Sequence, residues 1–194
     1  TLVPTSWDGI IAGLITDKFD IIMSGMTITQ QRNLKVNFSN PYLVVGQTIM
    51  MRKDLEGTIK TAKDLDKENY TIVTKLGVTG EIATKKFFKK AKIVTFETEA
   101  DAAAEVLSGK AAAMVYDQPY NVLFMSDKGK DKLVHLDTPL TYEPLGWAIR
   151  KGDPDFLNWL NNFLKQSQED KVVGFSDELY EKWLVDTSWL QRVQ

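Results

Sequence analysis

The sequence predicts an α/β fold, and three observations lead to that class. Short apolar runs typical of buried strands alternate along the chain with segments whose apolar residues recur at helical spacing. The order is repeatedly strand, helix, strand, which favours mostly parallel sheets flanked by helices. Hydrophobic residues make up 43% of the 194 residues and charged residues 26%, which are the proportions of a globular protein rather than a disordered one.

The first elements are expected close to the start of the chain. Residues 2–6 look extended, and Ser6 or Asp8 could cap a helix whose apolar side chains share one face. These side chains are Ile10, Ile11, Leu14 and Ile15. Residues 19–23 then predict a buried strand that ends at Ser24.

The alternation continues to the end of the chain. Thr29 and the polar residues after it indicate the start of a short helix, and residues 38–42 a turn. A second unit begins at about Gly46. The remaining elements are expected strands at residues 44–51, 70–74, 93–96 and 112–116 and expected helices at residues 81–89, 100–107, 154–164 and 179–184.

Two segments of the chain are similar to each other, at residues 14–25 and 107–117. In both, a helix ends, a lysine marks the loop and an apolar strand follows. Gly25 and Asp117 then fall at the same distance from that lysine, each at the carboxyl end of its strand. Open parallel sheets bind ligands at that edge, so two facing sheets would bring these residues to opposite walls of one cleft. Generic strand–helix–strand patterning is the alternative explanation of the similarity.

The composition excludes several classes of function. With 24 basic and 26 acidic residues the net charge is −2, which gives no reason to expect a nucleic-acid partner. The lysines at positions 85, 86, 89, 90 and 92 are read as the solvated face of a helix. Without cysteine there is no disulfide, thiolate metal site or cysteine nucleophile, and the single histidine, His135, cannot build a histidine-based metal site. We therefore expect no metal, no cofactor and a structural role for His135.

The sequence also shows no targeting or membrane segment. No apolar run reaches the length of a membrane span, and no signal peptide opens the chain as given.

Residues 24–32, with the sequence SGMTITQQR, contain groups suited to an acidic ligand. Gly25 lets the backbone bend and leaves its carbonyl open to a donor, and Thr27 offers a hydroxyl and a backbone N–H. Arg32 carries a planar fork that matches a carboxylate with two parallel hydrogen bonds. The alternative makes Thr29 a helix cap and Arg32 a surface charge.

The second unit offers complementary groups. Thr79 and Gly80 lie between an expected strand and helix, where backbone N–H groups attract anions. The segment lacks the lysine and hydroxyl residue that end a phosphate-binding P-loop, so a carboxylate is a better candidate than a nucleotide. Asp117, directly after an apolar strand, could pair with an ammonium group. Trp7 could form an aromatic wall for a ligand, or equally belong to the core.

These residues lie in segments that resemble a known family. They are WDGII at residues 7–11, KFD at 18–20, SGMTITQQR at 24–32, VNFSNPY at 36–42 and GWAIRKG at 146–152. Together they resemble the polar amino-acid-binding proteins of ABC transporters, the bacterial solute-binding protein family 3. The likeness runs from Leu2 to about Trp183, with the segments in the family's order.

The resemblance implies a two-lobed fold of the periplasmic-binding-protein type II, with a hinge made by two strand crossovers. The crossovers would lie near residues 42–47 and 141–146. Lobe 1 would hold residues 1–46 and 146–194, and lobe 2 residues 47–145. Each lobe would contain a mostly parallel sheet flanked by helices.

The resemblance also implies roles for the candidate residues. Arg32 would bind the α-carboxylate of a free amino acid, helped by Thr27 and by the backbone of Thr79 and Gly80. The implied protein is an extracytoplasmic receptor, periplasmic or lipid-anchored, which closes around its ligand and delivers it to the permease of an ABC importer.

At the other end of the ligand, Asp117 and the carbonyl of Gly25 would take the α-ammonium group, and Trp7 would flank the side chain. Trp7 and nearby acidic residues favour a basic or polar ligand. Glu143, near the second crossover, could reach a cationic ligand side chain.

The sequence departs from the family at two places. The chain starts at what resembles the family's second strand, so lobe 1 is expected to lack its first strand and helix. An N-terminal segment not recorded here, or a second chain, would then supply the strand, because unpaired backbone groups in a sheet are costly. Residues 110–113 read Lys-Ala-Ala-Ala where relatives commonly have Lys-Ala-Asp, which weakens the positioning of the strand there.

Two other functions remain as alternatives. Cyclohexadienyl dehydratases resemble these binding proteins, and their chemistry needs a general acid, for which Glu143 and Asp117 are the candidates. A ligand-sensing domain of a membrane receptor is the other alternative. The tail at residues 185–194 does not lead into an apolar span, which favours a free or lipid-anchored binding protein. We therefore expect a binding protein and not an enzyme.

Overall fold

The computed structural model describes residues 1–136, 138–169, 177–186 and 188, and within them the chain forms two compact units. Unit 1 comprises Thr1–Val44 and Glu143–Asp186, and unit 2 contains Val45–Tyr142. The chain therefore crosses from one unit to the other twice. The final residues expected in lobe 1, 187–194, lie outside the described residues except for Ser188.

Apart from the long helix α6, unit 1 is built from short elements. In chain order the elements of unit 1 are α1 (Ile10–Ile15), β1 (Ile21–Ile22), α2 (Gln30–Asn33), β2 (Asn37–Phe38), β3 (Leu43–Val45), β9 (Glu143–Leu145), β10 (Ala148–Ile149), α6 (Pro154–Glu169), α7 (Asp177–Tyr180) and a π-helical turn at Glu181–Val185. The strands form a sheet of order β1-β10-β2, and β3 pairs with β9 beside the two crossings. No helix among the described residues is both long and apolar enough to cross a membrane.

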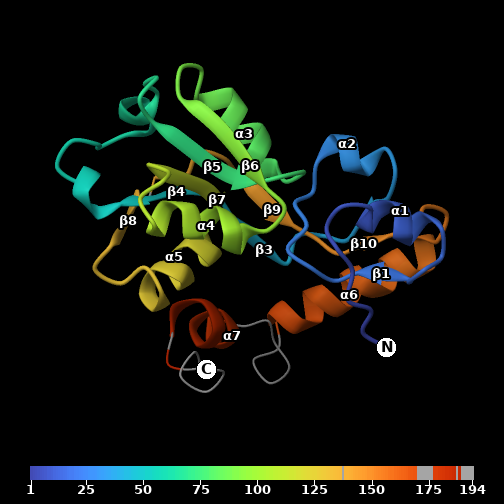
Figure 1. Cartoon of the computed structure of the whole chain (residues 1–194). Helices are drawn as coiled ribbons and strands as arrows, with labels where there is room; N and C mark the ends of the chain where they lie inside the picture. The colour runs from blue at the N-terminus through green and yellow to red at the C-terminus, as the bar shows by residue number, and fades with distance from the viewer. Residues whose placement is uncertain (137, 170–176, 187, 189–194) are drawn as a thin grey trace. The chain divides into compact units, whose positions relative to one another are not determined.

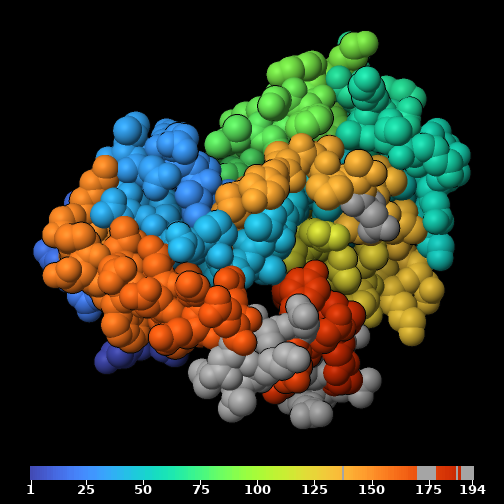
Figure 2. Space-filling view, turned by 180° about the vertical axis from the view of Figure 1, so that it is seen from behind, coloured from blue at the N-terminus to red at the C-terminus, as the bar shows by residue number. Residues whose placement is uncertain are grey.

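The core of unit 1 lies on both faces of β10. Ala148 packs on one face with Leu14 of α1 and Ile22 of β1, while Ile149 packs on the other with Leu160 of α6. Successive strand residues point to opposite faces, which is why two neighbours in β10 serve two different clusters. Figure 2 shows α6 in orange next to blue residues from the first part of the chain.

Unit 2 is a larger sheet with helices on both faces (Figure 1). Its elements are β4 (Gln47–Arg52), 3-10 turns at Lys53–Leu55 and Ala62–Leu65, β5 (Thr71–Lys75), α3 (Thr79–Phe87), β6 (Lys92–Phe96), α4 (Glu99–Leu107), β7 (Ala113–Asp117), α5 (Gln118–Asp127) and β8 (Leu133–Leu136). The strand order is β6-β5-β7-β4-β8. β5 pairs in parallel with β6 and β7, while β4 is antiparallel to β7 and β8. All strands but β4 therefore share one direction.

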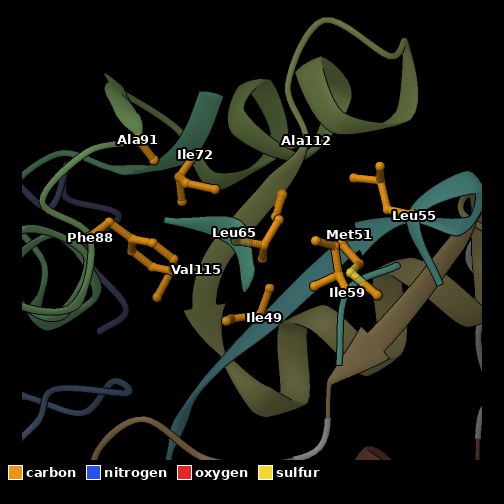
Figure 3. Packing of buried hydrophobic residues seen from close by; sticks show 11 residues of the cluster. Ile49, Met51, Leu55, Ile59, Leu65, Ile72, Phe88, Ala91, Ala112 and Val115 are labelled. Carbon is orange, nitrogen blue, oxygen red and sulfur yellow. The ribbon is translucent and has the colours of Figure 1, made fainter. Parts of the chain in front are cut away.

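Successive residues of β4 pack into two different cores, one on each face of this sheet. Ile49 and Met51 face a cluster that includes Phe88, which directly follows α3 (Figure 3). Met50 faces the other side, where Val106 of α4 packs. Because both faces are covered, the strands carry continuous apolar runs rather than alternating ones.

The expected α/β class and most elements are confirmed, with local corrections. Neither Ser6 nor Asp8 caps α1, because its N-cap is Gly9, whose φ of 82° lies in the left-handed region that favours glycine. The single strand expected at residues 44–51 is two strands, interrupted at Gly46. The expected strand at residues 19–23 is reduced to β1, and α5 was not predicted at all.

The expectation of a mostly parallel sheet fits unit 2, but the strand pairings in unit 1 differ. There both β1 and β2 pair antiparallel with β10. β10 enters the sheet between β1 and β2 only after the chain has returned from unit 2, and a local pattern of strands and helices does not reveal such a pairing.

Candidate functional site

In unit 1, three of the predicted ligand residues form one cluster. The guanidinium carbon of Arg32 lies 5.5 Å from the centroid of the Trp7 ring, and Arg32 Nη1 donates a hydrogen bond of 2.8 Å to the Thr27 carbonyl. Thr27 is 6% exposed, and Arg32 and Trp7 are half-buried. The guanidinium therefore has a defined position, unlike that of a solvated surface arginine.

The short helix α2 brings Arg32 to this position. Thr29 is its N-cap, with the Thr29 hydroxyl oxygen accepting from the Arg32 backbone N–H at 3.1 Å. The expectation that Thr29 caps a helix is confirmed. A capping role for Thr29 and a ligand-binding role for Arg32 were weighed against each other from the sequence. The two are compatible, because the cap fixes the turn that carries the Arg32 side chain.

Gly25 follows β1 in an exposed loop of unit 1. It is not among the glycines with positive φ, and of the described residues a Cβ at this position would meet only Leu145, whose Cδ1 would lie 3.9 Å away. Backbone strain therefore does not require a glycine here, and what the residue offers is an exposed main chain.

In unit 2, the predicted residues come together around a side chain that the sequence analysis did not select. Asp117 ends β7, and Thr79 begins α3. Gln47, the first residue of β4, lies opposite Asp117 in the sheet register. Its Nε2 donates to Asp117 Oδ1 at 2.5 Å and to Thr79 Oγ1 at 3.3 Å. A glutamine inside the apolar run at residues 43–51 was the available signal, since buried amides need partners.

Next to Asp117, the phenol of Tyr116 is kept neutral. Burial raises the pKa of Tyr116 far above its ordinary value, helped by the negative charges of Glu99 and Asp117. Burial likewise raises the pKa of Tyr120 to about 12. Both phenols therefore stay protonated at neutral pH, and neither is suited to act as a base.

Glu143 is a buried carboxylate in β9 of unit 1. It is 4% exposed, and its Oε2 has no hydrogen-bond partner among the residues that the structure describes. An ionised carboxylate removed from water is costly unless a cation or donors compensate it. Glu143 is therefore a second acidic candidate for contact with a cationic ligand.

The residues assigned structural roles are His135 and the five lysines at positions 85 to 92. His135 lies in β8 with its Nε2 2.7 Å from the Thr48 hydroxyl oxygen. The five lysines at positions 85 to 92 are exposed, but only Lys85 and Lys86 lie in α3, while Lys89 and Lys90 follow the helix and Lys92 begins β6. The prediction of a single helix face is therefore wrong for three of them. Within the described part of the chain, no group of three or more histidine, cysteine or acidic side chains could hold a metal ion.

The family follows from comparison with known sequences. The model of the bacterial extracellular solute-binding proteins, family 3, matches residues 1–186. The chain belongs to this family. The expected two-lobed α/β fold is thereby confirmed, since solved structures of the family match the chain closely.

One such structure, a putative binding component of an ABC transporter from Wolinella succinogenes complexed with lysine, is 62% identical. The match covers 98% of this chain and 81% of the Wolinella succinogenes protein, with a TM-score of 0.93. The L-cystine-binding protein TcyJ of Escherichia coli is 30% identical over 183 residues, which are 94% of this chain and 66% of that protein. The chain thus spans about two thirds of the length of this relative.

An enzyme is also among the relatives. The cyclohexadienyl dehydratase of Pseudomonas aeruginosa is 26% identical over 183 residues, covering 94% of this chain and 67% of the enzyme.

Proposed function

We propose that this protein is the amino-acid-binding receptor of an ABC importer and that it closes two lobes around the ligand's α-carboxylate and α-ammonium groups. The observation that carries the proposal is the Arg32 cluster of unit 1. A half-buried guanidinium held by the Thr27 carbonyl and the Trp7 ring is pre-organised to receive a carboxylate.

The proposed carboxylate site begins with Arg32. Its Nη1 donates to the Thr27 carbonyl, which restrains the plane of the guanidinium fork, and the guanidinium carries five N–H donors in all. The Thr27 hydroxyl and the backbone at Thr79 and Gly80 would add donors. The latter two residues open α3, and the start of a helix favours negative charge.

The proposed ammonium site consists of Asp117 and the carbonyl of Gly25. A carboxylate at the end of a buried strand interacts strongly with a cation once water is excluded. Asp117 is half-buried, so a ligand that covers it would strengthen this interaction.

A ligand that contacts groups from both lobes binds the closed arrangement better than the open one. Ligand binding would therefore shift the population towards closure, and the permease would recognise the closed shape. We propose an extracytoplasmic location, periplasmic or lipid-anchored, in keeping with the name of the family.

For the ligand we propose a basic or polar amino acid, with lysine as the first candidate. The 62% identical solute-binding protein is complexed with lysine. Glu143 supports a cationic side chain, because its buried and unpartnered oxygen would gain a counter-charge.

We further propose that an additional strand joins unit 1 along β1. β1 is an edge strand of its sheet, and beside it lies a hollow of about 640 Å³, lined by residues that include Leu2, Val3, Ile21 and Ile22. A segment preceding Thr1 in a longer polypeptide would supply the strand, with a second chain as the alternative. Intact mass and sedimentation of the protein isolated from its source separate the two, since a dimer of the present chain would support the second.

The enzyme alternative rests on the dehydratase relative and has a direct test. The protein is incubated with prephenate and with arogenate while aromatic product is followed. We expect no product above the buffer rate, because the chemistry needs a general acid and Asp117, one of the two candidates, already accepts a hydrogen bond from the Gln47 amide.

The proposal as a whole is tested by thermal-shift screening against the twenty amino acids, followed by calorimetry. A ligand that binds only the folded state raises the melting temperature. Stabilisation by lysine or arginine, and none by their decarboxylated amines, is expected. No stabilisation by any amino acid would contradict the proposed function.

A further inference from the structure

We propose that Gln47 is the positioning residue of the ligand site in unit 2, and that Gly80 is a glycine because a Cβ would displace the Gln47 amide. The proposal rests on the function proposed above and adds to it two residues with roles in orienting the ligand contacts. All the residues concerned lie within unit 2.

The first step is the orientation of the Gln47 amide. Its nitrogen reaches both Asp117 Oδ1, at 2.5 Å, and Thr79 Oγ1, at 3.3 Å. Only the NH₂ end can face a carboxylate, since an amide oxygen there would place two acceptors in contact. The contact with Asp117 therefore fixes which way the amide points, and one side chain joins Asp117 to Thr79.

The second step is the rigidity of this link. Gln47 is 1% exposed. Its backbone N–H donates to Thr141 Oγ1 at 3.1 Å, and its carbonyl accepts from the Leu140 N–H at 2.7 Å. Residues 45 and 142 are where the chain enters and leaves unit 2. Gln47 is thus tied to the returning segment through its backbone and to the two candidate ligand contacts through its side chain.

The third step concerns Gly80. An ideal Cβ on this residue would lie 2.7 Å from Gln47 Oε1 and 3.3 Å from Thr74 Oγ1. Gly80 is not among the glycines with positive φ, so the requirement is one of space and not of backbone conformation. Gln47 Oε1 and Thr74 Oγ1 are both buried, and neither has a hydrogen-bond partner within the described part of the chain. The helix start therefore approaches the amide as closely as a glycine allows.

These three steps define what substitution should do. Gln47→Met keeps the length and apolar volume of the side chain but removes the donor to Asp117. Gly80→Ala keeps the Gln47 donor but displaces the amide that carries it. Both variants should change the environment of the Asp117 carboxylate, whereas Gly57→Ala, with nothing within 4 Å of its Cβ, should not.

The first measurement needs no ligand. The ¹³C resonance of the Asp117 side-chain carboxyl is assigned by its loss in Asp117→Asn and compared among the variants. We expect it to move in Gln47→Met and in Gly80→Ala and to stay in place in Gly57→Ala. An unmoved resonance in both of the first two variants overturns the positioning role, whether or not the protein binds amino acids.

The second measurement is a double-mutant cycle of lysine affinity with Gln47→Met and Asp117→Asn. Loss of a hydrogen bond to a charged group should lower the affinity of Gln47→Met about tenfold or more. The double variant should bind no more weakly than Asp117→Asn alone, because Gln47 acts through Asp117. Fully additive losses would make Gln47 merely structural and overturn the proposal. Absence of lysine binding by the unaltered protein would instead contradict the proposed function, and the carboxyl resonance would still decide the role of Gln47.

Discussion

Arg32 and Trp7 are far apart in the chain, yet the guanidinium carbon lies 5.5 Å from the centre of the indole ring. The ring carries negative charge density on its face, so it attracts the cation and limits the directions in which the fork can point. With the Thr27 carbonyl holding Nη1, the side chain is constrained from two sides. A carboxylate that binds such an arginine does not have to order it first.

Trp7→Leu tests this constraint. Leucine keeps an apolar contact but removes the ring face, so lysine affinity should fall about twofold to thirtyfold, the range expected for losing 0.5–2 kcal/mol of cation–π attraction. Isothermal calorimetry measures the change. Trp159→Leu is the matched control, because Trp159 is 60% exposed on α6, and its affinity should stay unchanged. Equal affinities of the two variants would remove Trp7 from the site.

Glu143→Gln tests the proposed ligand class. If Glu143 faces a cationic ligand side chain, the variant should lose about 30-fold or more in lysine affinity, while its affinity for glutamine stays the same or rises. Glu105→Gln is the control, since Glu105 pairs with Lys110 at the surface. A variant that keeps its preference for lysine would show that Glu143 has another role.

The sheet core of unit 2 offers a matched pair of isoleucines. Ile72 is 0% exposed in β5, and Ile82 is 62% exposed in α3. Ile72→Ala should lower the free energy of unfolding by about 2–5 kcal/mol, because it removes buried methyl groups and leaves a cavity. Ile82→Ala should change it by less than about 0.5 kcal/mol. Urea denaturation followed by circular dichroism measures both, and similar losses would contradict the assigned burial.

Asp66 gives a prediction for the dependence of stability on pH. Its Oδ1 accepts from the backbone N–H groups of Lys89, Lys90 and Ala91, at 2.8, 2.6 and 3.0 Å. These hydrogen bonds, that from Lys90 foremost, lower the pKa of the Asp66 carboxyl from its ordinary value. Because the pKa is lower in the folded state, the carboxylate stabilises the fold at pH values above its pKa in the unfolded chain. This stabilisation is lost as the pH falls through the pKa of Asp66 in the folded protein.

Asp66→Asn should therefore be less stable than the unaltered protein at pH 7, and the difference should shrink as the medium is acidified below pH 4. Thermal melts across this range measure it. Glu68→Gln, at an exposed neighbouring position, is the control and should show a smaller change. A difference that stays constant with pH would contradict the role of the charge.

The sequence predicted those parts of the fold that depend on local patterns. The apolar spacing of α1, the Thr29 cap and the apolar runs that became β5, β6 and β7 are all found where expected. Such signals act over a few residues and need no knowledge of distant partners. The cap of α1 was predicted wrongly because a glycine with positive φ serves there instead of a side chain.

The failures depend on contacts that are distant in the chain. The run at residues 44–51 reads as one strand, but its first part pairs with β9 and its second part with β7 and β8, which lie far away in the chain. The antiparallel partner of β1 arrives more than a hundred residues later. Gln47 was missed for the same reason, since its partner Asp117 is 70 residues away.

Arg32→Ala provides the most direct test of the central claim, in a calorimetric titration with lysine and with its decarboxylated amine. Removing the guanidinium should cost roughly 2–5 kcal/mol of lysine affinity, which is about 30-fold to several thousand-fold. The amine, which has no carboxylate, should bind the variant and the unaltered protein equally weakly. An unchanged dissociation constant for lysine would contradict the assignment of Arg32 to the α-carboxylate.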